Sequence, residues 1–224
     1  MFARAMLVSF CILLPGRAMS QNWEVVANED GIQTWQAEVP GTSVFLVRAK
    51  ATINQPISKV FTVINANDIA LKKRWIDMLI DVKFIDNGAG NHREYHDYDF
   101  PWPANNRDLV LEFKSELKPE NRSVIVKIDS IQLPNFPEEQ STGVRGEAHF
   151  NYTLTHLGPG KTGLDVEVWA DPRGYLPKFM VNMVNRQWPL KTLRNLERET
   201  IESTLTPDAE IIKTIENGDS NLTH

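Results

Sequence analysis

The chain has 224 residues, of which 42% are hydrophobic and 24% charged, and its formal net charge at pH 7 is −5. This composition is typical of a folded globular domain and too apolar for an intrinsically disordered chain. The acidic balance and the lack of a basic run argue against nucleic acid as a partner, and a single cysteine excludes an intramolecular disulfide framework.

The first twenty residues have the pattern of an export signal. Arg4 precedes an apolar run from Ala5 to Leu14, and small residues follow up to Ser20. This order predicts a secretory signal peptide over residues 1–20, too short to span a bilayer and cleaved near Ser20. A mitochondrial presequence is the alternative, although only two arginines and little serine support it. We therefore expect a periplasmic or secreted protein without thiols, because Cys11 lies in the removed segment.

From Trp23 onward, three short strands and two short helices are expected. Turn residues such as Asp30-Gly31 separate the strands, which we place at Trp23–Asn28, Gly31–Val39 and Val44–Ile53. The hydrophobic period then changes to that of a helix over Pro56–Asn65, with proline at its first turn. Asn67 or Asp68 can cap a second helix that ends at Trp75.

Six further strands follow, and segments rich in proline, glycine and asparagine separate them. Because short connections cannot join parallel neighbours, we expect these strands to pair antiparallel. The predicted strands are Leu79–Asp86, His92–Phe100, Arg107–Leu117, Ser123–Leu133, Val144–Leu157 and Thr162–Asp171.

The last predicted element is a long amphipathic helix over Leu176–Ser203, which contains no glycine. Pro189 removes one backbone donor within it, so we expect an interruption or kink there. Residues 21–206 are expected to form one domain, and residues 207–224 a frayed polar tail.

This order of elements predicts an α+β helix-grip fold, in which a curved antiparallel sheet of about nine strands wraps around one long C-terminal helix. The concave apolar face of the sheet needs a cover, and only the last helix is long enough to supply it. A strongly curved sheet over a single helix can leave space unfilled, so we expect an internal apolar cavity.

Three segments add a family resemblance: Lys73–Asp77, Tyr98–Asp108 and Gly174–Asn182. Together with the element order, they resemble the steroidogenic-acute-regulatory-protein-related lipid transfer (START) domain from about Trp23 to about Ile201, here as a bacterial-type exported member. The resemblance implies one lipid in an internal tunnel, with the C-terminal helix as its lid. Two positions depart from the family pattern: Ile76 separates Trp75 from Asp77, and Phe113 stands where some members have a buried arginine.

Two groups of candidate site residues allow alternative interpretations. Arg107 can point into the tunnel toward a phosphate or hydroxyl of a ligand, or form a structural ion pair with Asp108. On the strand over 144–157, amphipathicity places the small and apolar residues inside. Comparison with the phosphatidylcholine-binding family member instead turns His149 and Asn151 toward the ligand, and the sequence leaves both orientations open.

On the last helix, Met180 and Met183 can belong to the core or contact a ligand, because flexible thioethers tolerate varied partners. The full set of predicted ligand-binding residues is Tyr98, Arg107, Phe113, Arg145, His149, Asn151, Met180, Met183 and Val184.

Metal binding and catalysis have weaker support. His92, Glu94 and His96 share one face of a strand, yet the two histidines would lie roughly 13 Å apart at about 3.3 Å per residue, too far for both to reach one ion at about 2.1 Å. No nucleophile elbow, Walker loop or dinucleotide fingerprint is present. We therefore predict no catalytic residues, no metal and no cofactor.

The predicted function is that of a monomeric, non-enzymatic protein that binds a single lipid or similar hydrophobic molecule, carries or senses it, and makes transient contact with membranes. One alternative is an enzyme acting on a small hydrophobic substrate in the same cavity, with Glu147 and His149 as an acid-base pair. Another is an interaction module with a solid core and no ligand.

Overall fold

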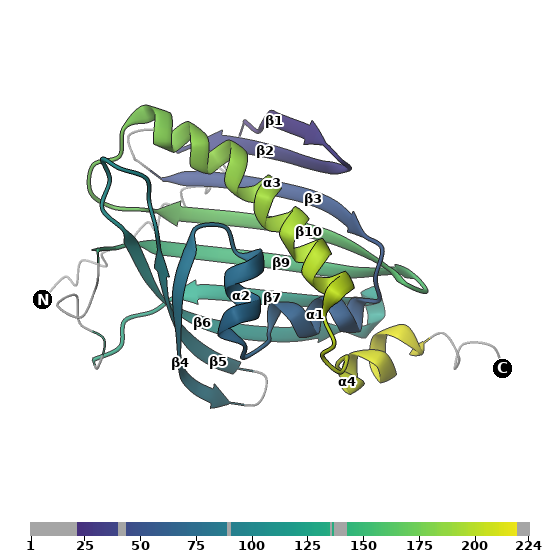
Figure 1. The fold of residues 1–224 in the computed structure, drawn as a ribbon. Helices are drawn as coiled ribbons and strands as arrows, with labels where there is room; N and C mark the ends of the chain where they lie inside the picture. The colour runs from purple at the N-terminus through teal and green to yellow at the C-terminus, as the bar shows by residue number, and fades with distance from the viewer. Residues whose placement is uncertain (1–21, 40–43, 89–90, 135, 137–142, 219–224) are drawn as a thin grey trace, which may run out of the picture.

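The computed structural model describes residues 22–39, 44–88, 91–134, 136 and 143–218. The predicted signal peptide therefore lies outside the described residues. Ten strands form a single curved sheet, and the helices lie on its concave side (Figure 1). The strands are β1 (Glu24–Glu29), β2 (Ile32–Glu38), β3 (Phe45–Ile53), β4 (Leu79–Gly88), β5 (Asn91–Tyr98), β6 (Arg107–Lys118), β7 (Ser123–Ser130), β8 (Val144–Arg145), β9 (Glu147–Gly158) and β10 (Lys161–Asp171).

The strand order across the sheet is β1-β2-β3-β10-β9-β7-β6-β5-β4, with antiparallel pairing throughout this path. β3 and β10 join the first three strands to the rest, so that Val47 pairs with Val168 and Ala49 with Val166. The predicted α+β helix-grip class is confirmed.

One predicted strand is divided. Residues 144–157 form two strands with Gly146 between them, and β8 pairs parallel with β6. A Cβ atom added at Gly146 would lie 3.2 Å from the Leu109 side chain and 3.4 Å from the Asp171 carbonyl oxygen. The residue thus permits a close approach that a larger one would obstruct. This division gives ten strands where the sequence predicted about nine.

The two short helices are α1 (Ile57–Ile64) and α2 (Ile69–Trp75). Of the two proposed caps for α2, Asp68 is the one that acts, since its side chain accepts a hydrogen bond from the Leu71 amide at 2.9 Å. A 3₁₀ turn, η1 (Pro119–Asn121), connects β6 to β7.

The long helix α3 (Lys178–Glu202) crosses the concave face of the sheet (Figure 1). It continues through Pro189, where we expected an interruption. After Pro189, the helix buries Leu190, Leu193 and Leu196 in the hydrophobic core. None of the helices in the described ranges is long and apolar enough to cross a membrane.

The C-terminal segment differs from the expected frayed tail. It forms α4 (Ala209–Ile211) and a π-helical turn, η3 (Ile212–Glu216), and it buries Ile211 and Ile215 in the core. Polar contacts hold both ends, since the Asp208 amide donates to Thr62 Oγ1 and the Ser58 amide donates to a Glu216 carboxylate oxygen, each at 2.9 Å. The helical spacing of Ile211 and Ile215 therefore determines the structure of this segment, although most of its residues are polar.

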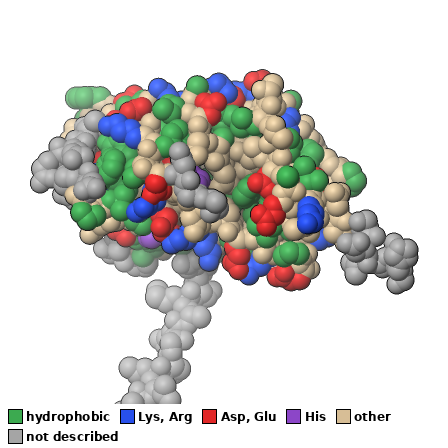
Figure 2. Space-filling model, turned by 90° about the horizontal axis from the view of Figure 1, so that it is seen from below, with side chains coloured by type: hydrophobic (Ala, Val, Ile, Leu, Met, Phe, Trp, Pro, Cys, Tyr) green, Lys and Arg blue, Asp and Glu red, His purple; other side chains and the backbone are tan. Residues whose placement is uncertain are grey.

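The described surface carries charges of both signs. On the face seen in Figure 2, acidic and basic side chains alternate among the described residues and do not gather in a patch of one sign. This face lacks the extended basic surface that nucleic-acid binding uses.

Candidate ligand-binding cavity

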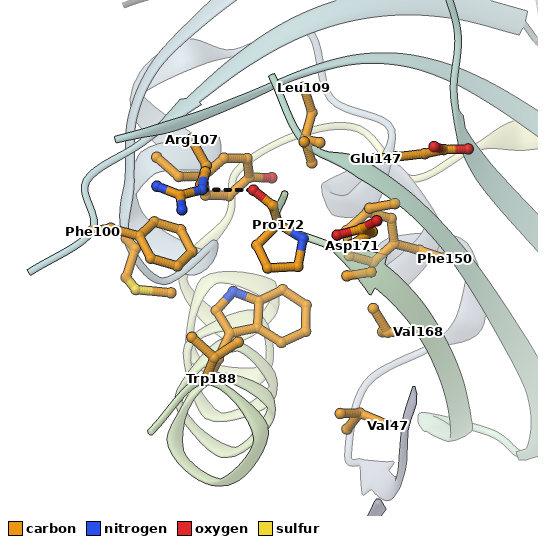
Figure 3. Close-up of a pocket in the computed structure, with 16 residues that line it drawn as sticks. Val47, Phe100, Arg107, Leu109, Glu147, Phe150, Val168, Asp171, Pro172 and Trp188 are labelled. Carbon is orange, nitrogen blue, oxygen red and sulfur yellow. Dashed lines mark hydrogen bonds between the residues drawn. The ribbon is translucent and has the colours of Figure 1, made fainter. Parts of the chain in front are cut away.

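An apolar cavity of about 90 Å³ lies between the concave face of the sheet and α3 (Figure 3). We call it the main cavity. Its walls come from the sheet, from the two loops at residues 99–106 and 172–177, and from α3. The apolar side chains among them include Val47, Phe100, Leu109, Ala148, Phe150, Val168, Val184 and Trp188.

The orientation of β9, which the sequence left open, is settled by these walls. Ala148 and Phe150 face the main cavity. His149 points to the other side of the sheet, where its Nδ1 atom lies 2.8 Å from Asp129 Oδ1, and Asn151 is exposed. Simple amphipathicity therefore predicts this strand correctly, and His149 and Asn151 do not reach the cavity.

The same orientation separates the members of the acid-base pair, because Glu147 borders the main cavity and His149 does not. His149 Nε2 lies 3.7 Å from Glu147 Oε1, and both side chains are about two-fifths exposed. Glu147 also pairs with Arg173 at 3.1 Å. The Glu147, His149 and Arg173 side chains form a partly exposed cluster, of which only Glu147 borders the main cavity.

Arg107 occupies the edge of the main cavity and holds two loops together. Its Nε atom donates to the Pro172 carbonyl oxygen at 2.7 Å (Figure 3), and Nη2 donates to the Arg173 carbonyl oxygen at 3.0 Å. Nη1 donates to the Asn105 carbonyl oxygen. Loops 99–106 and 172–177 are thereby fixed beside each other, and burial lowers the pKa of Arg107 from its ordinary value.

Of the two alternatives for Arg107, the structural ion pair with Asp108 is wrong. Asp108 is fully buried and accepts from Arg145 instead, with Arg145 Nη2 2.9 Å and Nε 3.1 Å from Asp108 Oδ2. Successive residues of a strand point to opposite faces, so the two neighbours cannot meet the same partners. Arg145 consequently faces a separate polar surface pocket of about 320 Å³.

The remaining predicted ligand-binding residues fall into different places. Tyr98 and Val184 line the main cavity, and Phe113 lines a smaller space deeper in the fold. Met180 is fully buried but does not line the main cavity. The side chain of Met183 lies outside the described residues.

The deeper space, which we call the inner cavity, has a volume of about 20 Å³. Tyr98, Phe150 and Trp188 line both cavities, so the inner cavity adjoins the main one at these three side chains. Its other walls include Trp75, His96, Phe113 and Thr192.

A buried polar network borders the inner cavity. Glu94 accepts from His92 Nε2 at 2.8 Å, from His96 Nε2 at 2.5 Å and from Lys72 Nζ at 2.9 Å. His96 Nδ1 lies 3.0 Å from the Tyr98 hydroxyl. Lys72 and Glu94 are completely buried, and Lys72 Nζ also donates to the Ile64 carbonyl oxygen at 3.2 Å.

Burial and the network partners shift the pKa values of Lys72, Glu94 and His96. Burial lowers the pKa of Lys72 and of His96, against the opposing attraction of Glu94. Burial alone would raise the pKa of Glu94, but hydrogen bonds from both histidines and the charge of Lys72 hold it well below its ordinary value. Lys72 and Glu94 lie 2.9 Å apart as a buried ion pair, so that each offsets the charge of the other.

The geometry also bears on the metal hypothesis. The two histidine rings turn toward each other, which the strand spacing alone did not predict, but they meet on the Glu94 carboxylate. Among the described residues, no cluster of three or more His, Cys, Asp or Glu side chains is arranged to hold a metal ion.

Trp188 separates the interior from the surface, and it is not among the residues predicted from the sequence. It lines the main cavity, the inner cavity and an outer groove of about 200 Å³ between α3 and Pro101. Its ring lies 6.0 Å from that of Phe150, measured between centroids. A large aromatic residue directly before Pro189 in the predicted helix was the available signal.

The chain is similar to proteins of one family. A model of the START domain family matches residues 15–201. An uncharacterized Pseudomonas aeruginosa protein is 25% identical over 183 residues, which make up 81% of this chain and 88% of that protein.

Two solved structures share the fold. The crystal structure of human STARD10 has a TM-score of 0.69 at 20% identity, over 80% of this chain and 73% of that one. A fragment of the STAR-related lipid transfer protein from Xanthomonas axonopodis has a TM-score of 0.69 at 20% identity, over 80% of this chain and 98% of that one. At these identities the likeness shows the fold alone.

Proposed function

Since the chain belongs to the START domain family, we propose that it binds a single lipid or similar hydrophobic molecule between the sheet and α3, and that it carries or senses this molecule without catalysing a reaction. The observation that carries the proposal is the apolar cavity beneath α3. Burial of apolar surface stabilises a complex by roughly 25 cal/mol per Å² without any covalent step.

The proposal requires the interior to enlarge. Pockets for small ligands usually have volumes of about 300–1,000 Å³, and the main cavity has about 90 Å³. Trp188, Met78 and Val184 line both the main cavity and the outer groove, so displacement of these side chains would join the two spaces. We propose that this wall opens when a ligand is loaded.

We further propose that the loops beside the cavity touch the membrane that supplies the ligand. Trp102 is 89% exposed and Tyr175 is 85% exposed. The same loops place Phe100 and Pro172 in the cavity wall, and Arg107 binds the loops together. Tryptophan and tyrosine favour the boundary between water and lipid.

Export of a monomeric protein to the periplasm or beyond completes the proposal. Its support is the order of Arg4, an apolar run and small residues within residues 1–20. A mature chain that begins near Gln21, as read by N-terminal sequencing of protein from the source cell, would agree with it. A mature chain that retains Met1 would contradict it.

Uptake of a fluorescent fatty-acyl lipid tests the ligand site. We expect the wild-type chain to bind the probe and Ala148→Leu to bind it at least several-fold more weakly, because the added side chain fills the main cavity. Asn151→Leu is the matched control, since the same strand carries it on the opposite, exposed face.

Equal uptake by Ala148→Leu and wild-type protein would place the ligand elsewhere. Absence of uptake across a panel of lipids would support an interaction module with a solid core.

A further inference from the structure

The inner cavity combines small size with polar groups at the closed end of an apolar space. Its volume of about 20 Å³ holds about one group of the size of a water molecule. Because Tyr98, Phe150 and Trp188 border both cavities, an apolar chain in the main cavity would direct its terminal group into the inner one.

The network fixes the direction of the hydrogen bond at Tyr98. The Glu94 carboxylate can only accept, so the hydrogen of His96 lies on Nε2, 2.5 Å from Glu94. Burial lowers the pKa of His96, and the neutral ring therefore accepts at Nδ1 from the Tyr98 hydroxyl at 3.0 Å. Tyr98 thus uses its proton within the network and presents its oxygen lone pairs as acceptors.

Trp75 brings a hydrogen-bond donor to the same inner cavity. Trp75 lines the inner cavity and is only 2% exposed. Its indole N–H has no hydrogen-bond acceptor among the described residues. A buried donor without an acceptor costs free energy, so an acceptor arriving with a ligand would be favoured there.

We propose that the inner cavity binds the terminal hydroxyl group of an uncharged lipid, which accepts from Trp75 Nε1 and donates to the oxygen of Tyr98. A hydroxyl group is both donor and acceptor, and it matches the two groups at once. The inference rests on the proposed function and adds the chemical class of its ligand: a lipid with an alcohol group at the end that enters first.

Charge and size argue against an acidic or zwitterionic group at this end. Glu94 already balances the charge of Lys72, and a further anion would be repelled by the buried Glu94 carboxylate. A phosphate is also larger than the inner cavity. The phenol remains a neutral group, since burial raises the pKa of Tyr98.

Competition between three hexadecyl probes tests the inference. The full chain is equilibrated with equal concentrations of hexadecanol, fluorohexadecane and palmitate, and the bound probes are extracted and quantified by mass spectrometry. Fluorine matches the hydroxyl closely in size but has no hydrogen to donate. We expect hexadecanol to be preferred over fluorohexadecane by roughly tenfold, the effect of one or two net hydrogen bonds.

Three variants assign the preference to the site. Tyr98→Phe removes the hydroxyl and keeps the ring, whereas Trp75→Phe replaces the indole and its N–H with a smaller apolar ring. Each should reduce the preference for hexadecanol over fluorohexadecane several-fold. Tyr95→Phe is the control, because Tyr95 lies on the same strand and lines neither cavity. If Tyr98→Phe fails to fold, the ratios of bound hexadecanol to bound fluorohexadecane in Trp75→Phe and in the wild-type chain still test the inference.

The outcomes separate the inference from the proposed function. Equal binding of hexadecanol and fluorohexadecane, or a preference for palmitate, would overturn the hydroxyl site and leave the carrier intact. A preference that persists in both Tyr98→Phe and Trp75→Phe would overturn it as well. Failure of all three probes to bind would count against the carrier itself.

Discussion

At the scale of single residues, the network around Glu94 is the most unusual feature of the interior. A buried carboxylate is tolerated only with several donors, and Glu94 has three, from Lys72, His92 and His96. Its partners come from two elements, α2 and β5, which β4 separates in the sequence. Removing a single partner would leave a buried charge without compensation.

The network predicts a loss of stability in acid. The folded pKa of His96 lies below its ordinary 6.5 and that of Glu94 below its ordinary 4.5. As the pH falls through these values, the unfolded chain binds protons that the folded chain does not, so the free energy of unfolding decreases. We expect the melting temperature to fall steadily from about pH 7 to about pH 4.

Two variants isolate the histidine. His96→Gln keeps a donor toward Glu94 but does not titrate, so its melting temperature should change less than that of the wild type between about pH 6.5 and about pH 5. Asn151→Gln, at an exposed position on the outer face, changes no titratable group and should follow the wild type. A wild-type melting temperature that is constant or rises on acidification would contradict this account.

Residue roles could be predicted only where the signal is local. The sequence places His92, Glu94 and His96 on one face of a strand, and they do share it. It could not show that Lys72 completes the network, because α2 and β5 meet only in the folded chain. For the same reason, the partner of Asp108 proved to be Arg145 and not its neighbour.

At the scale of elements, the strands and helices were predicted well because their signals are local. Turn residues and a change of hydrophobic period mark their bounds, and β9 obeys simple alternation. Gly146 divides a predicted strand because of an approach to Leu109 and Asp171. That approach depends on pairing across the sheet, which one sequence does not reveal.

The C-terminal segment is the element where composition misled. Its polar residues suggested a tail, although Ile211 and Ile215 are spaced as on one face of a helix. In the structure these two side chains are almost completely buried. This segment closes the end of the core beside α1.

Truncation tests the contribution of that segment. A chain ending at Thr206 should lose about 3–6 kcal/mol in free energy of unfolding, since burial of one large aliphatic side chain stabilises by about 1.5–3 kcal/mol. A chain ending at Gly218 keeps both isoleucines and should match the full chain. Urea denaturation measures both, and equal stability of the two truncated chains would show that the segment contributes nothing.

At the scale of the whole molecule, the main cavity and the loops at residues 99–106 and 172–177 lie toward one end of the sheet. Trp102 and Tyr175 are exposed on loops that also form the cavity wall. The turn between β9 and β10 lies at the opposite end of the sheet (Figure 1). This arrangement would let a ligand pass from a bilayer to the interior with little exposure to water.

Sedimentation with phosphatidylcholine vesicles tests that arrangement. Trp102→Ala and Tyr175→Ala should each weaken vesicle binding several-fold, since each removes an aromatic side chain that favours the interface. Leu157→Ala, beside the β9–β10 turn and 52% exposed in the folded chain, should not. Equal loss in all three variants would indicate non-specific adsorption, and no loss in any would mean that another surface meets the membrane.

The central claim, that the space beneath α3 admits one hydrophobic guest, is tested most directly by native mass spectrometry of the full chain after incubation with a mixture of lipids. We predict one lipid mass per chain, with no second lipid bound. A spectrum of the bare protein alone, with every lipid left unbound, would contradict the claim.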